Sequence, residues 1–142
     1  MGIAKAVSVL SKDPSTKVGC VIIGEEGEPL TWGYNGQVRG ADDLLGDRNE
    51  RPAKFLHYEH SERNAIYSAA RSGIRLKGGT IYITSLTPCP DCARAIVQSG
   101  IKKIIVEYEA FNISNPRVLV WLENWELTKV MLREGGVEVL II

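Results

Sequence analysis

Three things are scarce in this sequence: cysteine, an excess of charge of either sign, and long hydrophobic runs. Only 3 of its 142 residues are cysteines, too few for a disulfide framework, which favours a reducing compartment. Its 17 basic residues balance 17 acidic ones, so no broad electrostatic field is available to hold a nucleic acid polymer. No apolar run approaches the roughly 20 residues of a membrane helix, and the amino terminus lacks a signal-peptide pattern. We therefore expect a cytoplasmic protein that binds neither membranes nor nucleic acid polymers.

What the sequence contains suits one domain with a hydrophobic core. Hydrophobic residues make up 44% of the chain and charged residues 24%, so we expect a single domain over residues 1–142. The periodicity predicts strands at residues 18–23, 30–34, 80–84, 101–106 and 137–142, and helices at residues 3–10, 62–71, 92–99 and 116–133. This alternation predicts an α/β fold, a three-layer α/β/α sandwich around a central mixed sheet of about five strands.

Two parts of this pattern bear on function. The helix at 92–99 connects two expected strands in a β-α-β unit, and open α/β sheets commonly place catalytic groups at such strand-to-helix turns. The polar stretch 38–54 is expected to be the longest irregular segment, and long loops in compact domains usually carry function or mobility. In the last helix, Trp121 and Trp125 are interpreted as core or subunit contacts because they are four residues apart.

The strongest chemical signal comes from His60, Glu62, Cys89 and Cys92. One imidazole and two thiolates leave the fourth position of a tetrahedral zinc ion open to water, and zinc lowers the pKa of such a water to about 7. Glu62 is an unligated carboxylate that can carry protons between this water and a substrate. The pattern therefore predicts a hydrolytic Zn²⁺ site, with His60, Cys89 and Cys92 as ligands and Glu62 as the catalytic acid and base.

The local sequence places these residues at two helix starts. His60 comes directly before a run of helix formers that Gly73 can end, and Pro88 and Pro90 flank Cys89 just before the next helix. Both thiols should therefore lie at the first turn of that helix. A helix amino terminus favours negative charge, which helps to keep the two cysteines as thiolates.

A closed structural zinc site is the alternative from the residues alone, since His57 or Cys20 could supply a fourth ligand. The chain would then be a noncatalytic, zinc-stabilised binding module. The ligand order and the glutamate two residues after His60 differ from the paired spacings of structural zinc fingers. We interpret His57 as a loop residue, and Cys20, inside an apolar run, as a small buried hydrophobic residue.

The segments His60-Ser61-Glu62 and Pro88-Cys89-Pro90-Asp91-Cys92 fit the H-x-E and P-C-x-x-C pattern of zinc-dependent nucleobase deaminases. Further matching segments occur in the same order over nearly the whole chain: residues 11–20, Gly33-Tyr34-Asn35-Gly36, Ala41-Asp42-Asp43 and residues 60–66. Together they resemble the deoxycytidylate (dCMP) deaminase family. The resemblance implies a cytidine deaminase-like fold and a hydrolase that converts dCMP to dUMP and ammonia, supplying dUMP for thymidylate synthesis. It also implies a homohexamer regulated by dCTP with Mg²⁺ and by dTTP.

The family pattern also implies how the substrate is held. Asn35 matches the asparagine that hydrogen-bonds the sugar 3'-hydroxyl, and the backbone amide of Ser61 would donate to the pyrimidine O2. Asn64 also matches the family motif and would lie one helical step from the site. A hairpin turn is the alternative for Asn35, and a helix-stabilising contact is the alternative for Asn64. The basic residues near family motifs are the candidates for the 5'-phosphate, and the sequence does not choose among them: Lys12, Lys17, Arg39 and Arg63.

The chain departs from the family pattern at two places. Ser61 stands where the family usually has alanine, and the segment Gly36-Gln37-Val38-Arg39-Gly40 lacks the proline of the usual Asn-Gly-x-Pro-x-Gly turn, which contributes to the effector site. Alternative substrates are dCTP, deoxycytidine, or another amine-bearing base such as guanine or a tRNA adenosine.

Overall fold

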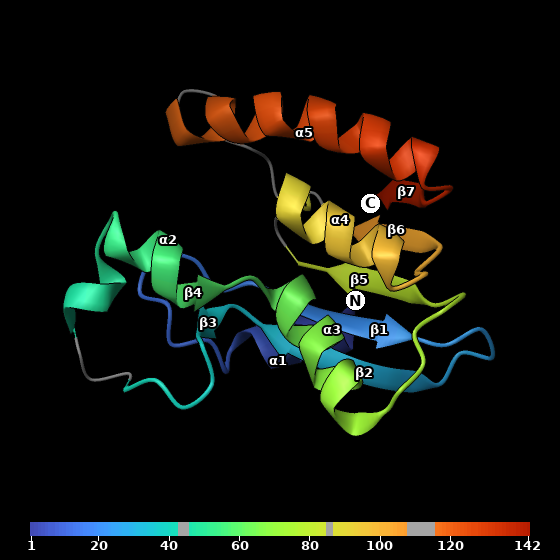
Figure 1. The fold of residues 1–142 in the computed structure, drawn as a ribbon, viewed down its shortest axis with the longest axis horizontal. Helices are drawn as coiled ribbons and strands as arrows, with labels where there is room; N and C mark the ends of the chain where they lie inside the picture. The colour runs from blue at the N-terminus through green and yellow to red at the C-terminus, as the bar shows by residue number, and fades with distance from the viewer. Residues whose placement is uncertain (43–45, 85–86, 108–115) are drawn as a thin grey trace.

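The computed structural model is built on a five-stranded sheet with helices on both faces (Figure 1). It describes residues 1–42, 46–84, 87–107 and 116–142, so Asp43 of the Ala41-Asp42-Asp43 segment lies outside the described residues. The sheet consists of β1 (Gly19–Ile23), β2 (Pro29–Tyr34), β5 (Thr80–Ile83), β6 (Lys103–Val106) and β7 (Glu138–Ile141). The helices are α1 (Gly2–Ser8), α2 (Ala53–His57), α3 (Ser61–Ser72), α4 (Pro90–Gln98) and α5 (Pro116–Glu134). A two-stranded ladder of β3 (Gly36–Gln37) and β4 (Tyr58–Glu59) and the 3₁₀ helix η1 (Gly46–Asn49) complete the described elements.

The sheet is mixed, as the sequence predicts. Its strand order is β2-β1-β5-β6-β7. β1 runs antiparallel to both β2 and β5, while β5, β6 and β7 are parallel to one another. The expected β-α-β unit is therefore confirmed: β5, α4 and β6 follow one another, and the cysteine segment lies between β5 and α4.

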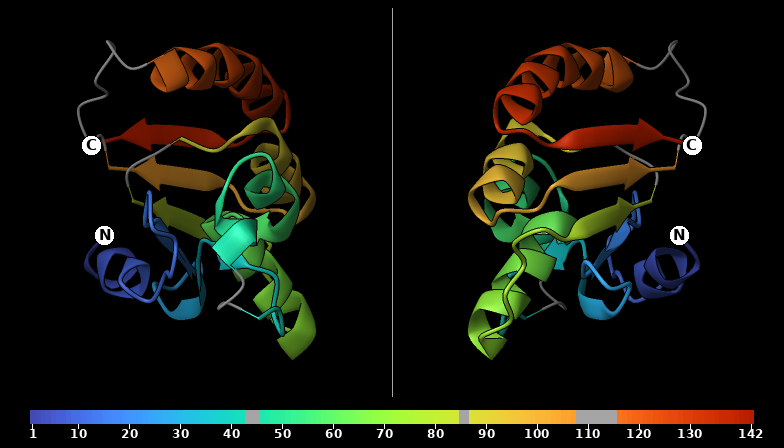
Figure 2. Two further views of the ribbon diagram at one scale, coloured as in Figure 1. Left: turned by 90° about the vertical axis from the view of Figure 1, so that its left-hand side faces the viewer. Right: turned by 90° about the vertical axis from the view of Figure 1, so that its right-hand side faces the viewer.

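The hydrophobic core lies between the sheet and its helices. Figure 2 shows α1 on one side of the sheet and α3 and α4 on the other. Helix α5 packs against α4 and reaches β7. Core side chains come from strands and helices alike: Cys20, Ile22, Ile81, Ile83, Ile104, Ala65, Ala69, Ile96 and Leu132. Alternate residues of β5 and β6 point into this core, which is the period-two pattern of a strand.

The first turn of helix α3 packs closely against strand β2. A Cβ atom at Gly33 of β2 would lie 2.2 Å from the carbonyl oxygen of Ser61 and 2.5 Å from the amide nitrogen of Ala65. Only a residue without a side chain allows this close approach. At its other end, α3 stops at Gly73, whose φ of 67° is left-handed, as the sequence predicts.

The expectation of an irregular segment over residues 38–54 is wrong for part of its length. Helix η1 and the beginning of α2 lie within it. The amide of Lys54 donates to the carbonyl of Glu50, and the Tyr58 hydroxyl donates to the Asn49 side chain. These local and short-range hydrogen bonds order a stretch whose polar composition suggested a loop.

Within the part of the chain that the structure describes, no helix has both the length and the apolar character needed to cross a membrane.

Candidate active site

Three potential metal ligands converge from two helix starts. His60 precedes the first residue of α3, Cys89 precedes the first residue of α4, and Cys92 lies in the first turn of α4. The Nδ1 atom of His60 is 3.4 Å from Sγ of Cys89 and 3.5 Å from Sγ of Cys92. Two ligands of a tetrahedral zinc ion, bonded at about 2.0–2.1 Å for nitrogen and about 2.3 Å for sulfur, lie roughly 3.6 Å apart. The cluster therefore fits a zinc ion.

The cluster has three protein ligands. Its ligand atoms all lie within 4.8 Å of one another, and among the described residues neither His57, Cys20 nor Glu62 belongs to it. Cys20 is buried in the core and its thiol donates to the Ser61 carbonyl oxygen over 3.1 Å. Burial also raises the pKa of the Cys20 thiol well above its ordinary value. This arrangement matches the open zinc site expected of a catalyst and gives no support to a closed structural one.

Hydrogen bonds within the cluster shift the pKa values of its members. The hydrogen bond with Cys92 lowers the pKa of Cys89 to about 4, and the same bond raises the pKa of Cys92. The hydrogen bond with Cys89 raises the pKa of His60 although burial opposes it. A metal ion needs two thiolates and a neutral imidazole, so metal binding must release protons from this cluster.

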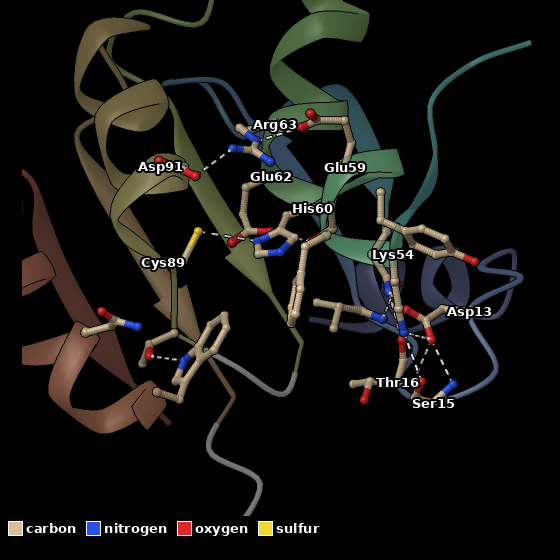
Figure 3. Close-up of a pocket in the computed structure, with 18 of the residues that line it drawn as sticks. Asp13, Ser15, Thr16, Lys54, Glu59, His60, Glu62, Arg63, Cys89 and Asp91 are labelled. Carbon is tan, nitrogen blue, oxygen red and sulfur yellow. Dashed lines mark hydrogen bonds and ion pairs between the residues drawn. The ribbon is translucent and has the colours of Figure 1, made fainter. Parts of the chain in front are cut away.

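Glu62 lies beside the ligand cluster in the first turn of α3. Its side chain is buried, and Figure 3 shows its carboxylate next to the His60 ring. The hydroxyl of Ser61 donates to Oε2 of Glu62 over 2.8 Å. The carboxylate therefore keeps its other oxygen for a partner in the pocket, which is what a proton carrier requires.

A cavity of about 760 Å³ opens beside these residues, and its size falls in the range of small-molecule sites. Asp13, Ser15, Thr16 and Lys54 lie on one side of His60, and Cys89 and Asp91 lie on the other (Figure 3). Asn35, Ser61, Arg63, Trp121 and Asn124 also line the cavity.

Asn35 holds one wall of the cavity together. Its Oδ1 accepts from the amide of Val18 over 2.8 Å, and its Nδ2 donates to Oδ2 of Asp13 over 2.9 Å and to the carbonyl of Thr16 over 2.8 Å. Asp13 in turn accepts from Lys54 Nζ over 2.7 Å. This network ties the segment before β1 to β2 and to α2.

Most of the other residues that the sequence suggested as substrate contacts do not line the cavity. Asn64 donates from Nδ2 to the carbonyl of Tyr34 over 2.8 Å and is not among the residues that line the cavity. Lys12, Lys17 and Arg39 do not line it either, whereas Arg63 does. The predicted substrate contacts of all these residues stay predictions.

Several cavity residues were missed by the sequence reasoning. Trp121 places its ring 6.3 Å from the ring of His60, and its indole N–H donates to Oγ1 of Thr87 over 3.1 Å. Trp125, one turn later, is a core residue, as one of the two expected roles predicts, whereas Trp121 lines the cavity. A subunit contact of either tryptophan stays a prediction. Arg51, Lys54 and Phe55 come from the stretch around residues 38–54 and the helix that follows it. The length and polarity of that stretch indicated a functional segment, but they did not indicate which of its residues would line the cavity.

Comparisons with known proteins agree with this geometry. Residues 1–108 match the family described as the cytidine and deoxycytidylate deaminase zinc-binding region. The chain is 37% identical over 136 residues to an "uncharacterized deaminase in luxG 3'region" of Aliivibrio fischeri, which covers 96% of this chain and 86% of that protein. It is 45% identical over 119 residues to the deoxycytidylate deaminase of Enterobacteria phage T4, which covers 84% of this chain and 54% of that enzyme. The chain thus spans about half the length of this phage relative.

A solved structure extends the comparison to the fold. The crystal structure of dCMP deaminase from the cyanophage S-TIM5, in complex with dCMP and dUMP, matches with a TM-score of 0.74 and 27% identity. The match covers 99% of this chain and 92% of that one. These findings confirm the predicted fold and the prediction of a zinc-binding deaminase, and the chain belongs to the cytidine and deoxycytidylate deaminase family.

Proposed function

We propose that this chain hydrolyses dCMP to dUMP and ammonia. The observation that carries the proposal is an open three-ligand cluster beside a buried, unligated Glu62 at the wall of a cavity. The phage T4 relative is a deoxycytidylate deaminase, and the S-TIM5 relative was crystallised with dCMP and dUMP. The same substrate and product suit the cavity described here.

In the proposed reaction, His60, Cys89 and Cys92 hold the metal and Glu62 moves the protons. Zinc, when bound by these residues, supplies a Lewis acid that activates water near neutral pH. Glu62 takes a proton from the attacking water and passes it to N3 of the cytosine ring as the oxygen adds to C4. It then takes the proton of the new C4 hydroxyl and delivers it to the amino group as the C4–N bond breaks, so that ammonia leaves and the C4 carbonyl forms.

The hydrogen-bonding capacity of Asn35 supports its proposed contact with the sugar. Both N–H donors of its amide are used by Asp13 and Thr16, and its oxygen accepts one bond from Val18. An amide oxygen has two lone pairs, so Oδ1 can accept one further hydrogen bond, and a sugar 3'-hydroxyl can donate it. The amide of Ser61 lies at the first residue of α3, where a helix N–H lacks an intrahelical partner, and it can donate to the pyrimidine O2.

The proposal is tested by measuring ammonia release from dCMP, deoxycytidine, cytidine and dCTP. We expect turnover of dCMP by the parent chain and its loss in Glu62→Ala, with zinc content unchanged in that variant. Turnover of dCTP or deoxycytidine in preference to dCMP would show that the proposed substrate is wrong, while the assignment as a deaminase would stand. Full turnover by Glu62→Ala would remove Glu62 from the proton-carrying role.

We also propose the finer features that the family resemblance implies: a single domain, a homohexamer, control by dCTP with Mg²⁺ and by dTTP, and a cytoplasmic location. The three free cysteines support the location, because a reducing compartment keeps thiols free. Light scattering tests the assembly, and dCMP turnover with and without dTTP or dCTP and Mg²⁺ tests the control. A monomer, or turnover that neither nucleotide changes, would contradict these features.

A further inference from the structure

Three cationic side chains line the cavity: Arg51, Lys54 and Arg63. A nucleotide's phosphate needs a cation whose charge is not already balanced, since a neutralised cation offers little further attraction. The ion pairs that these three residues already make therefore determine which of them can bind a phosphate.

Two of the three cations are already paired. Arg63 contacts Glu59 through Nε at 2.6 Å and Asp91 at 3.3 Å, and Asp91 also pairs with Arg94. Two carboxylates thus balance two guanidiniums, and Arg63 is neutralised within this group. Lys54 contacts Oδ1 of Asp13 at 2.7 Å, and both side chains of that pair are largely buried. Neither residue has a full positive charge to offer a ligand.

Arg51 is different. None of the ion pairs among the described residues involves it, and its guanidinium carbon lies 5.1 Å from the ring centre of Phe55, which also lines the cavity. Stacking on an aromatic ring holds a guanidinium in place while its N–H groups stay at the edge of the plane, where they can donate. Two such N–H groups match two oxygens of a phosphate.

Arg51 and Asn35 line the same cavity. Arg51 lies three residues before Lys54, whose ammonium contacts Asp13, the hydrogen-bond partner of Asn35. Lys54 also donates to the hydroxyl oxygen of Ser15 over 2.9 Å, which leaves the Ser15 hydroxyl hydrogen to donate toward the cavity. A sugar held by Asn35 would thus place its 5'-phosphate in the cavity that the unbalanced guanidinium lines.

We infer that Arg51, stacked on Phe55, binds the 5'-phosphate of the substrate and makes the site selective for a nucleoside monophosphate. The inference rests on the proposed function and adds the residue that reads the phosphate. One unbalanced arginine suits one phosphate group, whereas a triphosphate would bring its added negative charge to a wall that also holds the carboxylate of Asp13. A nucleoside without phosphate would leave Arg51 without a partner.

The test compares kcat/KM for dCMP, deoxycytidine and dCTP in the parent chain and in Arg51→Ala, Arg51→Lys and Arg71→Ala. Arg71 is an exposed arginine at the end of α3, outside the cavity, and serves as the matched control. In Arg51→Ala we expect the ratio of kcat/KM for dCMP over deoxycytidine to fall by roughly 10- to 100-fold, mainly through KM, since a hydrogen-bonded charge pair is lost. Arg51→Lys should recover part of the ratio, and Arg71→Ala should keep it.

Zinc content and thermal unfolding of each variant separate a folding defect from a lost contact. If the parent deaminates none of the three compounds, the proposed function itself fails. If the parent prefers dCMP and Arg51→Ala keeps that preference, only the assignment to Arg51 is overturned. A parent that prefers dCTP would overturn the selectivity for monophosphates.

Discussion

The hydroxyl of Ser61 donates a hydrogen bond to Oε2 of Glu62 over 2.8 Å. The two residues are neighbours in the sequence, and both are buried at the beginning of α3. The family resemblance implies an alanine at position 61, and an alanine has no hydroxyl that could make this bond. It fixes one oxygen of the carboxylate that is proposed to carry protons.

Removing this hydroxyl should slow the reaction without removing the metal. We expect Ser61→Ala to lower kcat by about fivefold, because one hydrogen bond is worth about 1 kcal/mol. Steady-state kinetics with dCMP and zinc analysis check the result. Ser68→Ala, a change farther along the same helix, is the control, and an unchanged kcat in Ser61→Ala would show that the bond does not position Glu62.

The close approach of α3 to β2 predicts the effect of a single added methyl group. In Gly33→Ala the new Cβ would lie 2.2 Å from the Ser61 carbonyl oxygen, so α3 must shift and carry His60 with it. We expect the free energy of unfolding to fall by about 1–3 kcal/mol, as in other overpacked cores, and zinc affinity to fall as well. Gly36→Ala is the matched control, since its Cβ would have no neighbour closer than 4.0 Å. Equal stability of the two variants would contradict the prediction.

The three hydrogen bonds of Asn35 predict a large loss of stability in Asn35→Ala. The variant leaves the buried amide of Val18 without its acceptor and removes both donors to the segment before β1. We expect the free energy of unfolding to fall by about 2–4 kcal/mol, measured by urea denaturation. Asn64→Ala loses only the bond to the Tyr34 carbonyl and should cost less than about 1.5 kcal/mol. Similar losses in both variants would argue against a special role for Asn35 in the fold.

The carboxylate of Asp13 predicts how stability changes with pH. Burial opposes ionisation, but the hydrogen bond from Lys54 and those from the amides of Ser15 and Thr16 outweigh it and lower the pKa of Asp13 below 3.8. A group with a lowered folded-state pKa stabilises the fold fully above its ordinary pKa. This contribution falls as the pH drops below the ordinary pKa, and it is lost once the pH has passed through the lowered folded-state pKa. Asp13→Asn should therefore be less stable at neutral pH, and the difference from the parent should shrink on acidification.

Urea denaturation of both proteins from neutral pH down to about pH 3 measures this difference. Because both proteins have the same potential metal ligands, comparing them isolates the contribution of Asp13. A constant difference over the whole pH range would show that the carboxylate is not linked to folding.

The clustering of the proposed metal ligands beside Glu62 could be predicted, because the position of each residue depends on local sequence. The histidine directly precedes one helix, and the two cysteines lie at the start of the next, so helix starts and short spacings in the sequence fix their positions. The cavity wall was not predictable in this way. Trp121 reaches the site only because α5 packs against α4, and Lys54 only because it pairs with Asp13, 41 residues earlier in the chain. Such long-range contacts leave no periodic signal in the sequence.

The zinc ligands also come from two different halves of the sheet. His60 belongs to α3, which rests on the antiparallel pair β1 and β2, while the cysteines belong to α4, which connects the parallel strands β5 and β6. The three ligand atoms meet only after both halves have docked. We therefore expect metal binding to require that both halves have docked, since either half alone offers an incomplete set of ligands.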